Sequence, residues 1–254
     1  MKKQDRGLRP EEQLRIVSRG ARLRQRRRET VLRLFAIAGV AGVSFLTGRS
    51  QQVKAEEAEE EVSAAEDLMR EHGVLNRILL IYDESIFRLE QNRELNPAVL
   101  SGAAGIIRAF IEDYHEKLEE DYLFPRYQKA GRLTDLVAVL KRQHRAGRRL
   151  TDSAMRLAKA SVLNSPEEKA ELVRDLKAFV RMYRPHEARE DTVLFPALKK
   201  IVSRNEYDSL GEEFEKKEHA LFGEDGFGTM VDKVAGLEKQ LGIYELAQFT
   251  PSSK

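Results

Sequence analysis

The stretch HEKLEEDYLFP, residues 115–125, returns 71 residues later as HEAREDTVLFP, residues 186–196. In both copies a His is followed four positions on by a Glu, and Leu-Phe-Pro closes the stretch. Side chains four residues apart lie on one face of an α-helix, so each copy presents an imidazole beside a carboxylate. The repeat therefore predicts two helices that carry the same pair of side chains.

Helical periodicity and capping signals place four long helices around these two copies. Ser63 begins a capping box, and Asn96 precedes a Pro at the first helical position. Thr134 is the expected cap of the third helix, and Ser165 opens the Ser-Pro-Glu-Glu start of the fourth. We expect helices at about 64–93, 97–129, 135–161 and 166–202. Helices of this length with short connections pack as an up-down-up-down antiparallel four-helix bundle.

A second relation between the halves concerns the other two histidines of the predicted bundle. His72 lies in the first helix and His144 in the third, 72 residues apart, against 71 for the repeated stretch. At ~1.5 Å of rise per residue, all four histidines fall within roughly two turns of one level. The chain is therefore a tandem of two helical hairpins, each supplying a single His and a His-x-x-x-Glu pair.

A single His-x-x-x-Glu on a charged helix is ordinarily a solvated ion pair, and that alternative applies to either copy alone. Here, however, the Leu-Phe of each copy buries only if its face is inward, and the His and Glu share much of that face. Buried charges need a partner or a metal, and four imidazoles with two bridging carboxylates suit two metal ions. The candidate metal ligands are His72, His115, Glu119, His144, His186 and Glu190. No residue is assigned a catalytic role.

At these residues the chain resembles the hemerythrin-like (HHE) domain family, and its His spacing is most similar to that of the di-iron proteins that repair iron centres. The resemblance covers about residues 63–202. It implies a four-helix bundle whose six ligands hold two iron ions, a non-haem di-iron centre with an oxo or hydroxo bridge. It also implies binding of oxygen, peroxide or nitric oxide, with or without redox turnover, so enzymatic activity stays an open question.

The chain departs from the family in two places. Blood-type oxygen carriers have a fifth His one turn after the third ligand, where this chain has Arg148. Without it both irons keep open positions, which favours reaction with small molecules over reversible oxygen storage. The repair proteins carry a Cys-bearing N-terminal module, and this chain has no Cys. The alternatives to a centre that turns over its ligand are a non-catalytic oxygen or nitric oxide sensor or carrier, and an iron storage or delivery protein.

The composition favours an all-α fold and restricts the chemistry. Of 254 residues, 34% are charged, none is Trp and 7 are Pro, which favours helices over a turn-rich β architecture. The lack of Cys excludes disulfides and thiolate metal sites. Residues 1–55 hold 14 Lys and Arg against 4 Asp and Glu, and the rest of the chain holds 30 against 38. An acidic body argues against nucleic acid as a partner.

The basic segment 1–55 has the pattern of an export leader. In RRRETVLRLFAIAGVAGVSFLTG, residues 26–48, three arginines precede about 15 mostly apolar residues, fewer than the roughly 20 of a spanning helix. Arg27 and Arg28 resemble the twin-arginine signal, although Thr30 stands where Phe is usual. We expect cleavage after Ala55, export by the twin-arginine translocase, and a periplasmic or extracytoplasmic location. The alternative is an uncleaved leader that anchors the chain to the membrane, or a basic tail that rests on anionic lipid.

The remaining segments give weaker signals. Residues 56–62 form an acidic linker, the bundle domain is 63–202, and 203–254 form a C-terminal helical extension to which no function is assigned. His219, in this extension, is expected at the surface rather than at a metal.

Several polar residues lie next to the candidate ligands in sequence. Core packing is the expected role for at least two of the three neighbouring tyrosines, with hydrogen bonding to a ligand as the alternative. They are Tyr114, Tyr122 and Tyr183. Glu120 and Asp121 are expected to be solvated.

Overall fold

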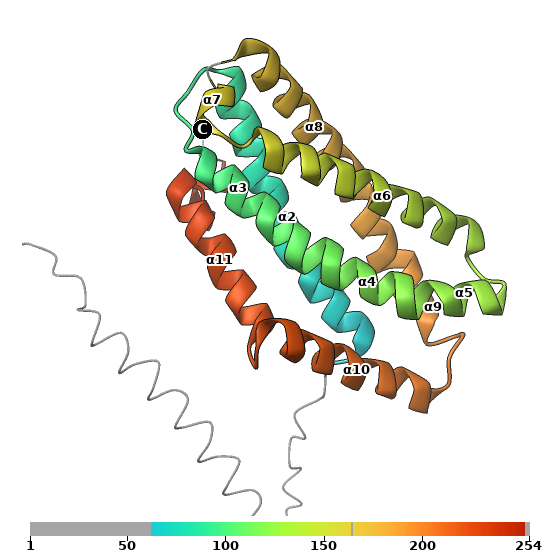
Figure 1. Cartoon of the computed structure of the whole chain (residues 1–254). Coiled ribbons are helices and arrows are strands. Elements are labelled where there is room, and N and C mark those ends of the chain that lie inside the picture. The colour runs from blue at the N-terminus through green and yellow to red at the C-terminus, as the bar shows by residue number, and fades with distance from the viewer. Residues whose placement is uncertain (1–61, 164, 252–254) are drawn as a thin grey trace, which may run out of the picture. The chain divides into compact units, whose positions relative to one another are not determined.

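A computed structural model describes residues 62–163 and 165–251, in which the four predicted long helices lie side by side (Figure 1). We call each of them a rod, because most of them are divided into several helical segments. No strand occurs among these residues, and the rods follow the predicted up-down-up-down order, so the all-α bundle is confirmed. The first rod is α2 (Ala64–Glu90), and the third is α6 (Thr134–Leu157), followed by α7 (Ala160–Leu163). The second rod comprises α3 (Pro97–Ile106), η1 (Ile107–His115), α4 (Glu116–Leu118), η2 (Glu119–Leu123) and α5 (Phe124–Ala130). The fourth comprises α8 (Pro166–Arg189), η3 (Glu190–Leu194) and α9 (Phe195–Leu198).

Capping side chains fix three of the helix starts where the sequence predicted them. The backbone N–H of Ser63 donates to Glu66 Oε2 at 3.0 Å. Asn96 Oδ1 accepts from the N–H two residues on at 3.0 Å, and Ser165 Oγ from the N–H three residues on at 3.4 Å. Each bond satisfies a donor that the first helical turn leaves unpaired, so these starts were readable from local sequence.

The other helix ends differ from the prediction by a few residues. Thr134 does not cap α6 but is its first residue, and Leu133 precedes it in the left-handed region with φ 52°. The first rod ends at Glu90 rather than 93, because Asn92 also adopts a left-handed φ, of 50°. The fourth rod ends at Leu198 rather than 202.

Three segments of the second and fourth rods are π-helical. These segments were not predicted from the sequence. Two of them, η2 and η3, lie at equivalent positions of the repeat. The N–H of Phe124 bonds the carbonyl of Glu119, five residues earlier, and the N–H of Phe195 bonds that of Glu190 in the same way. Each π turn ends just before the proline of the repeat, which has no N–H to donate. The widened turns therefore begin at the two candidate Glu ligands, a frequent location of π turns.

Two C-terminal helices complete the described part of the chain. Helix α10 (Arg204–Phe222) and α11 (Gly226–Leu241) both pack on α2, and α11 also packs on α3; a short 3₁₀ turn, η4 (Leu246–Phe249), follows. Their buried residues Phe214 and Val234 belong to the same hydrophobic core as the bundle. Arg77 of α2 donates to both carboxylate oxygens of Glu238 of α11, at 2.9 and 2.6 Å. The extension is thus part of one packed body with the bundle.

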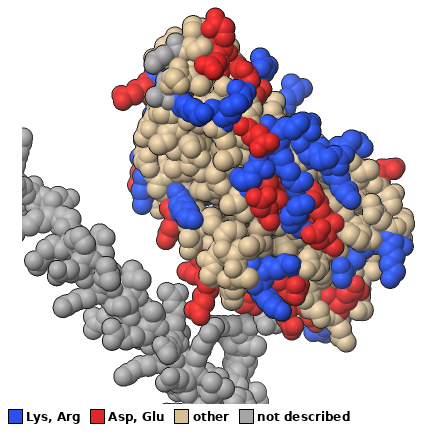
Figure 2. Space-filling model, viewed as in Figure 1, with Lys and Arg blue, Asp and Glu red and all other residues tan. Residues whose placement is uncertain are grey.

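The exposed faces of the bundle carry mixed charges. Figure 2 shows Lys and Arg interspersed with Asp and Glu on one face. Exposed ion pairs also join neighbouring helices, such as Arg156 with Glu171 at 2.6 Å. Within the described residues, no helix combines the length and the apolar character needed to cross a membrane.

Candidate metal centre

The six predicted ligands come together inside the bundle, one His from each rod. We call this group the histidine centre. Its members are buried, with exposed fractions from 0 to 4%: His72, His115, Glu119, His144, His186 and Glu190. Glu190 Oε2 lies 3.5 Å from His72 Nε2 and 3.1 Å from His186 Nε2. Glu119 lies 3.4 Å from His144 Nε2 and 4.0 Å from His115 Nε2. Each carboxylate therefore faces two imidazoles from different rods.

The other ring nitrogen of each histidine bonds outward, away from the carboxylates. His72 Nδ1 lies 2.7 Å from Asp191 Oδ1, and His115 Nδ1 lies 2.6 Å from Glu71 Oε2. The same holds in the second hairpin, where His144 Nδ1 meets Glu120 Oε1 at 3.1 Å and His186 Nδ1 meets Gln143 Oε1 at 2.9 Å. These oxygens accept hydrogen bonds, so the proton lies on Nδ1. Each Nε2 faces the carboxylates and is the nitrogen that can bind a metal once it carries no proton.

The repeat is explained by contacts that cross between the two hairpins. Asp191 and Phe195, from the second copy, both contact His72 of the first hairpin; the Phe195 ring stacks on the imidazole at 5.5 Å between centroids. At the equivalent positions of the first copy, Glu120 bonds His144, and Phe124 stacks on it, also at 5.5 Å. The acid after each Glu and the Phe of each Leu-Phe-Pro therefore position the single histidine of the other hairpin.

The residues that precede the single histidines form a second equivalent pair. Glu71, before His72, holds His115 of its own hairpin, and Gln143, before His144, holds His186. The spacing of 72 residues between Glu71 and Gln143 matches that of the histidines they precede. The two positions differ in charge, since one hydrogen-bond acceptor is a carboxylate and the other an amide.

Arg148 occupies the place of the fifth histidine and binds two carboxylates there. Its guanidinium lies 2.8 Å from Glu116 Oε2 and 2.9 Å from Glu120 Oε1. Tyr183 donates to the other oxygen of Glu116 at 2.6 Å. The Tyr183 hydroxyl fits against Gly147, where an added Cβ would lie 2.0 Å from it. Glu116 thus has a cation and a donor, although it is only 1% exposed.

The two carboxyl groups of the histidine centre have opposite pKa shifts. Burial raises the pKa of Glu119, and the neighbouring Glu190 raises it further. Burial also acts upward on Glu190, but His186 and His72 outweigh it, so the pKa of Glu190 is lowered. Without a metal, Glu119 therefore holds a proton more tightly than Glu190 does.

The pKa values of the histidines are also shifted in opposite directions. Burial opposes protonation of His72, but its bonds to Asp191 and Glu190 outweigh burial and raise its pKa to about 10. Burial lowers the pKa of His115, as does the charge of His72. Burial also lowers the pKa of His144 despite its bond to Glu120. His115 and His144 are thus neutral near neutral pH, whereas metal binding has to displace the proton that His72 holds.

Unpartnered polar atoms test whether the histidine centre fits a metal. Both oxygens of Glu119, both of Glu190, and Nε2 of His115 and of His144 are buried without a hydrogen-bond partner within the described part of the chain. One donor atom each from Glu119, His144, His186 and Glu190 lie within 4.8 Å of one another. Buried polar groups are ordinarily paired, so their convergence fits bound cations.

Several other expectations are decided by the geometry. His219 is exposed on α10, 3.8 Å from Glu215, as predicted. Glu120 was expected to be solvated, and this was wrong: its side chain is 14% exposed because it binds His144 and Arg148. Asp121 is exposed as expected.

The three tyrosines take different roles. Tyr114 packs against Phe110 and Phe222, and Tyr122 is partly exposed, with a hydrogen bond to Glu213 at 3.2 Å. Tyr183 donates to Glu116, a group beside the centre. The carboxylates that hold the Nδ1 atoms were not predicted, although an acid follows the Glu of each repeat copy, as Glu120 and Asp191. The leader and its expected cleavage site lie outside the described residues.

Comparison with known proteins identifies a family whose match ends where the fourth rod ends, at Leu198. The model of the hemerythrin HHE cation binding domain matches residues 63–198. Uncharacterized proteins of Mycobacterium bovis and of two strains of Mycobacterium tuberculosis are 48% identical over 219 residues, which is 86% of this chain and 86% of each relative. No solved structure matches the chain.

Proposed function

Because the chain belongs to the hemerythrin HHE family, we propose that the histidine centre holds two iron ions and binds oxygen, peroxide or nitric oxide. One observation carries this proposal: four Nε2 atoms face two buried carboxylates, while the four Nδ1 atoms are bonded outward. Imidazole and carboxylate are ligands that iron accepts, and no thiolate competes. When bound, the iron pair supplies redox-active Lewis acids to a small ligand.

The protein's own residues orient the donors and keep water away. The outward bonds from Nδ1 fix the ring orientation and tautomer of each histidine. Phe124 and Phe195 cover the single histidines with rings that are 0% exposed. A centre enclosed in this way suits ligands of a few atoms rather than a bulky substrate.

Arg148 adds a fixed positive charge where the blood-type carriers have a fifth histidine. Its guanidinium pairs with Glu116 and Glu120, and it has no lone pair to offer a metal. The histidine centre then supplies six protein ligands for two ions, which leaves coordination positions for a small molecule.

The experiment that tests this function separates turnover from reversible binding. The iron-loaded chain is mixed with peroxide, nitric oxide or oxygen, and both the ligand and the absorption spectrum are followed. Consumption of many equivalents per iron pair supports an enzyme, and a stoichiometric, reversible spectral change supports a carrier or sensor. If no ligand alters the spectrum and a chelator removes the iron readily, the storage or delivery alternative holds instead.

We also propose that residues 1–55 direct export through the twin-arginine translocase, on the strength of the arginine pair and the apolar segment that follows it. Cell fractionation of the native chain and of an Arg27→Lys/Arg28→Lys variant tests this. Export of the native chain alone, with a mature N-terminus at Glu56, supports the proposal. A full-length chain in the membrane fraction would support an uncleaved anchor.

A further inference from the structure

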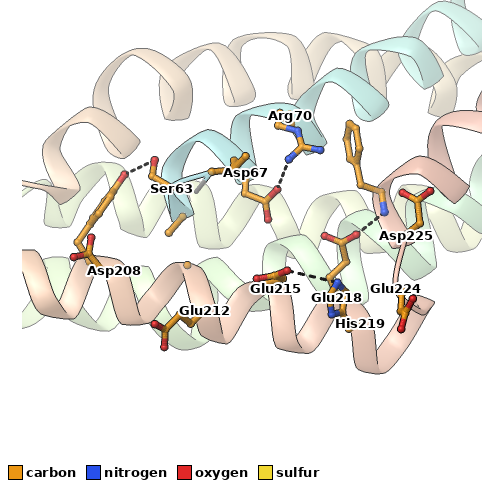
Figure 3. Close-up of a pocket in the computed structure, with 15 residues that line it drawn as sticks. Ser63, Asp67, Arg70, Asp208, Glu212, Glu215, Glu218, His219, Glu224 and Asp225 are labelled. Carbon is orange, nitrogen blue, oxygen red and sulfur yellow. Dashed lines mark hydrogen bonds and ion pairs between the residues drawn. The ribbon is translucent and has the colours of Figure 1, made fainter. Parts of the chain in front are cut away.

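A pocket of about 310 Å³ opens beside the N-terminal end of α2, α10 and the turn between α10 and α11 (Figure 3). We call it the acidic pocket, since seven of the 15 residues that line it are Asp or Glu. At its rim, Glu215 has a side chain 65% exposed, and Glu224 and Asp225 are also exposed. None of these residues belongs to the histidine centre.

Three carboxylates come together at the acidic pocket: Asp67 and Glu218 line it, and Glu71 is a buried neighbour that does not. Asp67 and Glu71 stand four residues apart on α2, and Glu218 approaches them from α10. One oxygen from each lies within 4.8 Å of the others. Figure 3 shows Asp67 and Glu218 turned toward the same space. The Asp67 side chain is 15% exposed, Glu218 is 8% exposed and Glu71 is 0% exposed, so exposure falls from the rim inward.

This cluster is poorly neutralised by its protein neighbours. Arg70 contacts Asp67 at 3.3 Å, and Glu218 accepts from the backbone N–H of Phe227. Glu71 Oε1 is buried and has no hydrogen-bond partner among the described residues. The buried hydroxyl of Tyr114 faces the same carboxylates, whose charges add to burial in raising its pKa. Buried like charges of this kind are costly unless a cation neutralises them.

The chemistry of the donors restricts the cation. Three carboxylates provide hard oxygen ligands without imidazole or thiolate, a set that suits Mg²⁺, Ca²⁺, Mn²⁺ and Fe²⁺. Glu71 also connects this cluster to the histidine centre, because its Oε2 bonds His115 Nδ1 at 2.6 Å. A cation at Glu71 would therefore be one side chain away from an iron ligand.

We propose that Asp67, Glu71 and Glu218 form a second divalent-cation site, through which Fe²⁺ passes from the acidic pocket to the histidine centre. The delivery step rests on the proposed di-iron function. The site itself rests only on the three carboxylates and the unpartnered oxygen of Glu71.

Titration of the iron-loaded full-length chain with Mn²⁺ tests the site, with free Mn²⁺ measured by electron paramagnetic resonance. The test variant is Asp67→Asn/Glu218→Gln, which keeps side-chain size. The matched control is Glu94→Gln/Asp113→Asn, which removes the same charge from two exposed positions away from the acidic pocket. We expect one Mn²⁺ per chain in the native protein and the control, and at least tenfold weaker binding in the test variant. Equal binding in all three would overturn the proposal.

Anaerobic loading of the metal-free chain with Fe²⁺ tests delivery. The test variant should fill the histidine centre at least tenfold more slowly but to the same final content, whereas the control should load at the native rate. Native-rate loading by the test variant would refute delivery. If the native chain takes up no iron, the proposed function fails, and the same Mn²⁺ titration of the iron-free native, test and control chains still decides on the acidic site. Circular dichroism checks folding, and Asp67→Asn alone serves if the double variant does not fold.

Discussion

Asp191 lies 2.7 Å from Nδ1 of His72 and so joins the second copy of the repeat to the single histidine of the first hairpin. Glu120 and His144 form the equivalent pair in the opposite direction. Such carboxylates fix the tautomer of a histidine and raise its basicity as a ligand. The two hairpins are therefore interlocked at the histidine centre, and each depends on the other for the orientation of one imidazole.

Asp191→Ala tests this interlock. Loss of the acceptor frees the His72 ring, so iron affinity should fall by about 10- to 100-fold, the usual effect of removing such a partner. Competition with a chelator measures the affinity. Asp121→Ala, an exposed acid beside Glu120, is the control and should bind iron as the native chain does. An unchanged affinity in Asp191→Ala would mean that the bond to His72 is dispensable.

Glu119→Ala and Glu190→Ala test the ligand set. Each carboxylate faces two imidazoles, so its removal should abolish most of the paired iron. Iron content per chain and the absorption spectrum measure the loss. The control is His219→Ala, since His219 is exposed and should leave both readouts unchanged. Two irons per chain in either Glu variant would contradict the proposed ligands.

Arg148→Ala tests the ion pairs at the place of the fifth histidine. The substitution leaves Glu116, which is 1% exposed, without its cation. The free energy of unfolding should fall by about 2–4 kcal/mol, because removing one partner of a buried pair leaves an uncompensated charge. Urea denaturation measures it. The control is Arg142→Ala, at an exposed position of the same helix, which should stay within about 0.5 kcal/mol of the native chain. An equally small change in Arg148→Ala would show that its ion pairs do not stabilise the fold.

The metal-free protein should lose stability as the pH rises through the range in which Asp67 ionises. Burial and then Glu218 raise the pKa of Asp67 from 3.8 to about 6. The folded state therefore binds this proton more tightly than the unfolded state, so the stabilisation is complete below pH 3.8 and is lost as the pH rises through about 6. At higher pH the cost is up to about 2 kcal/mol after solvent screening.

Asp67→Asn removes this ionisation and should raise the Tm of the metal-free chain, by more at pH 7.5 than at pH 4. Thermal unfolding in the presence of a chelator measures the two differences. Asp113→Asn, at an exposed position, should change neither. An equal effect of Asp67→Asn at both pH values would show that burial of this carboxylate does not set the pH dependence.

The sequence predicted the fold and the convergence of the six residues because both follow from local rules. Capping residues such as Ser63, Asn96 and Ser165 act within one helical turn, and a His-x-x-x-Glu pair shares a face by helix geometry alone. The matched spacings of the two hairpins then place the histidines at one level.

The partners of the Nδ1 atoms depend instead on how neighbouring rods are rotated about their axes. Glu120 looked like a solvated acid because its own helix does not reveal that His144 and Arg148 face it. The π turns at Glu119 and Glu190 were also missed, since no residue propensity distinguishes them from an α-helix before a proline. The start of α6 at Thr134 was misassigned because a left-handed Leu133 is unfavourable on local grounds.

The most direct test of the central claim is the iron content of the purified chain together with its absorption spectrum before and after addition of oxygen, peroxide and nitric oxide. The account predicts about two irons per chain and a charge-transfer band that responds to at least one of these molecules. A chain that binds no iron, or that binds zinc and shows no spectral response, would contradict it and reduce the repeated His-x-x-x-Glu to a structural feature of the bundle.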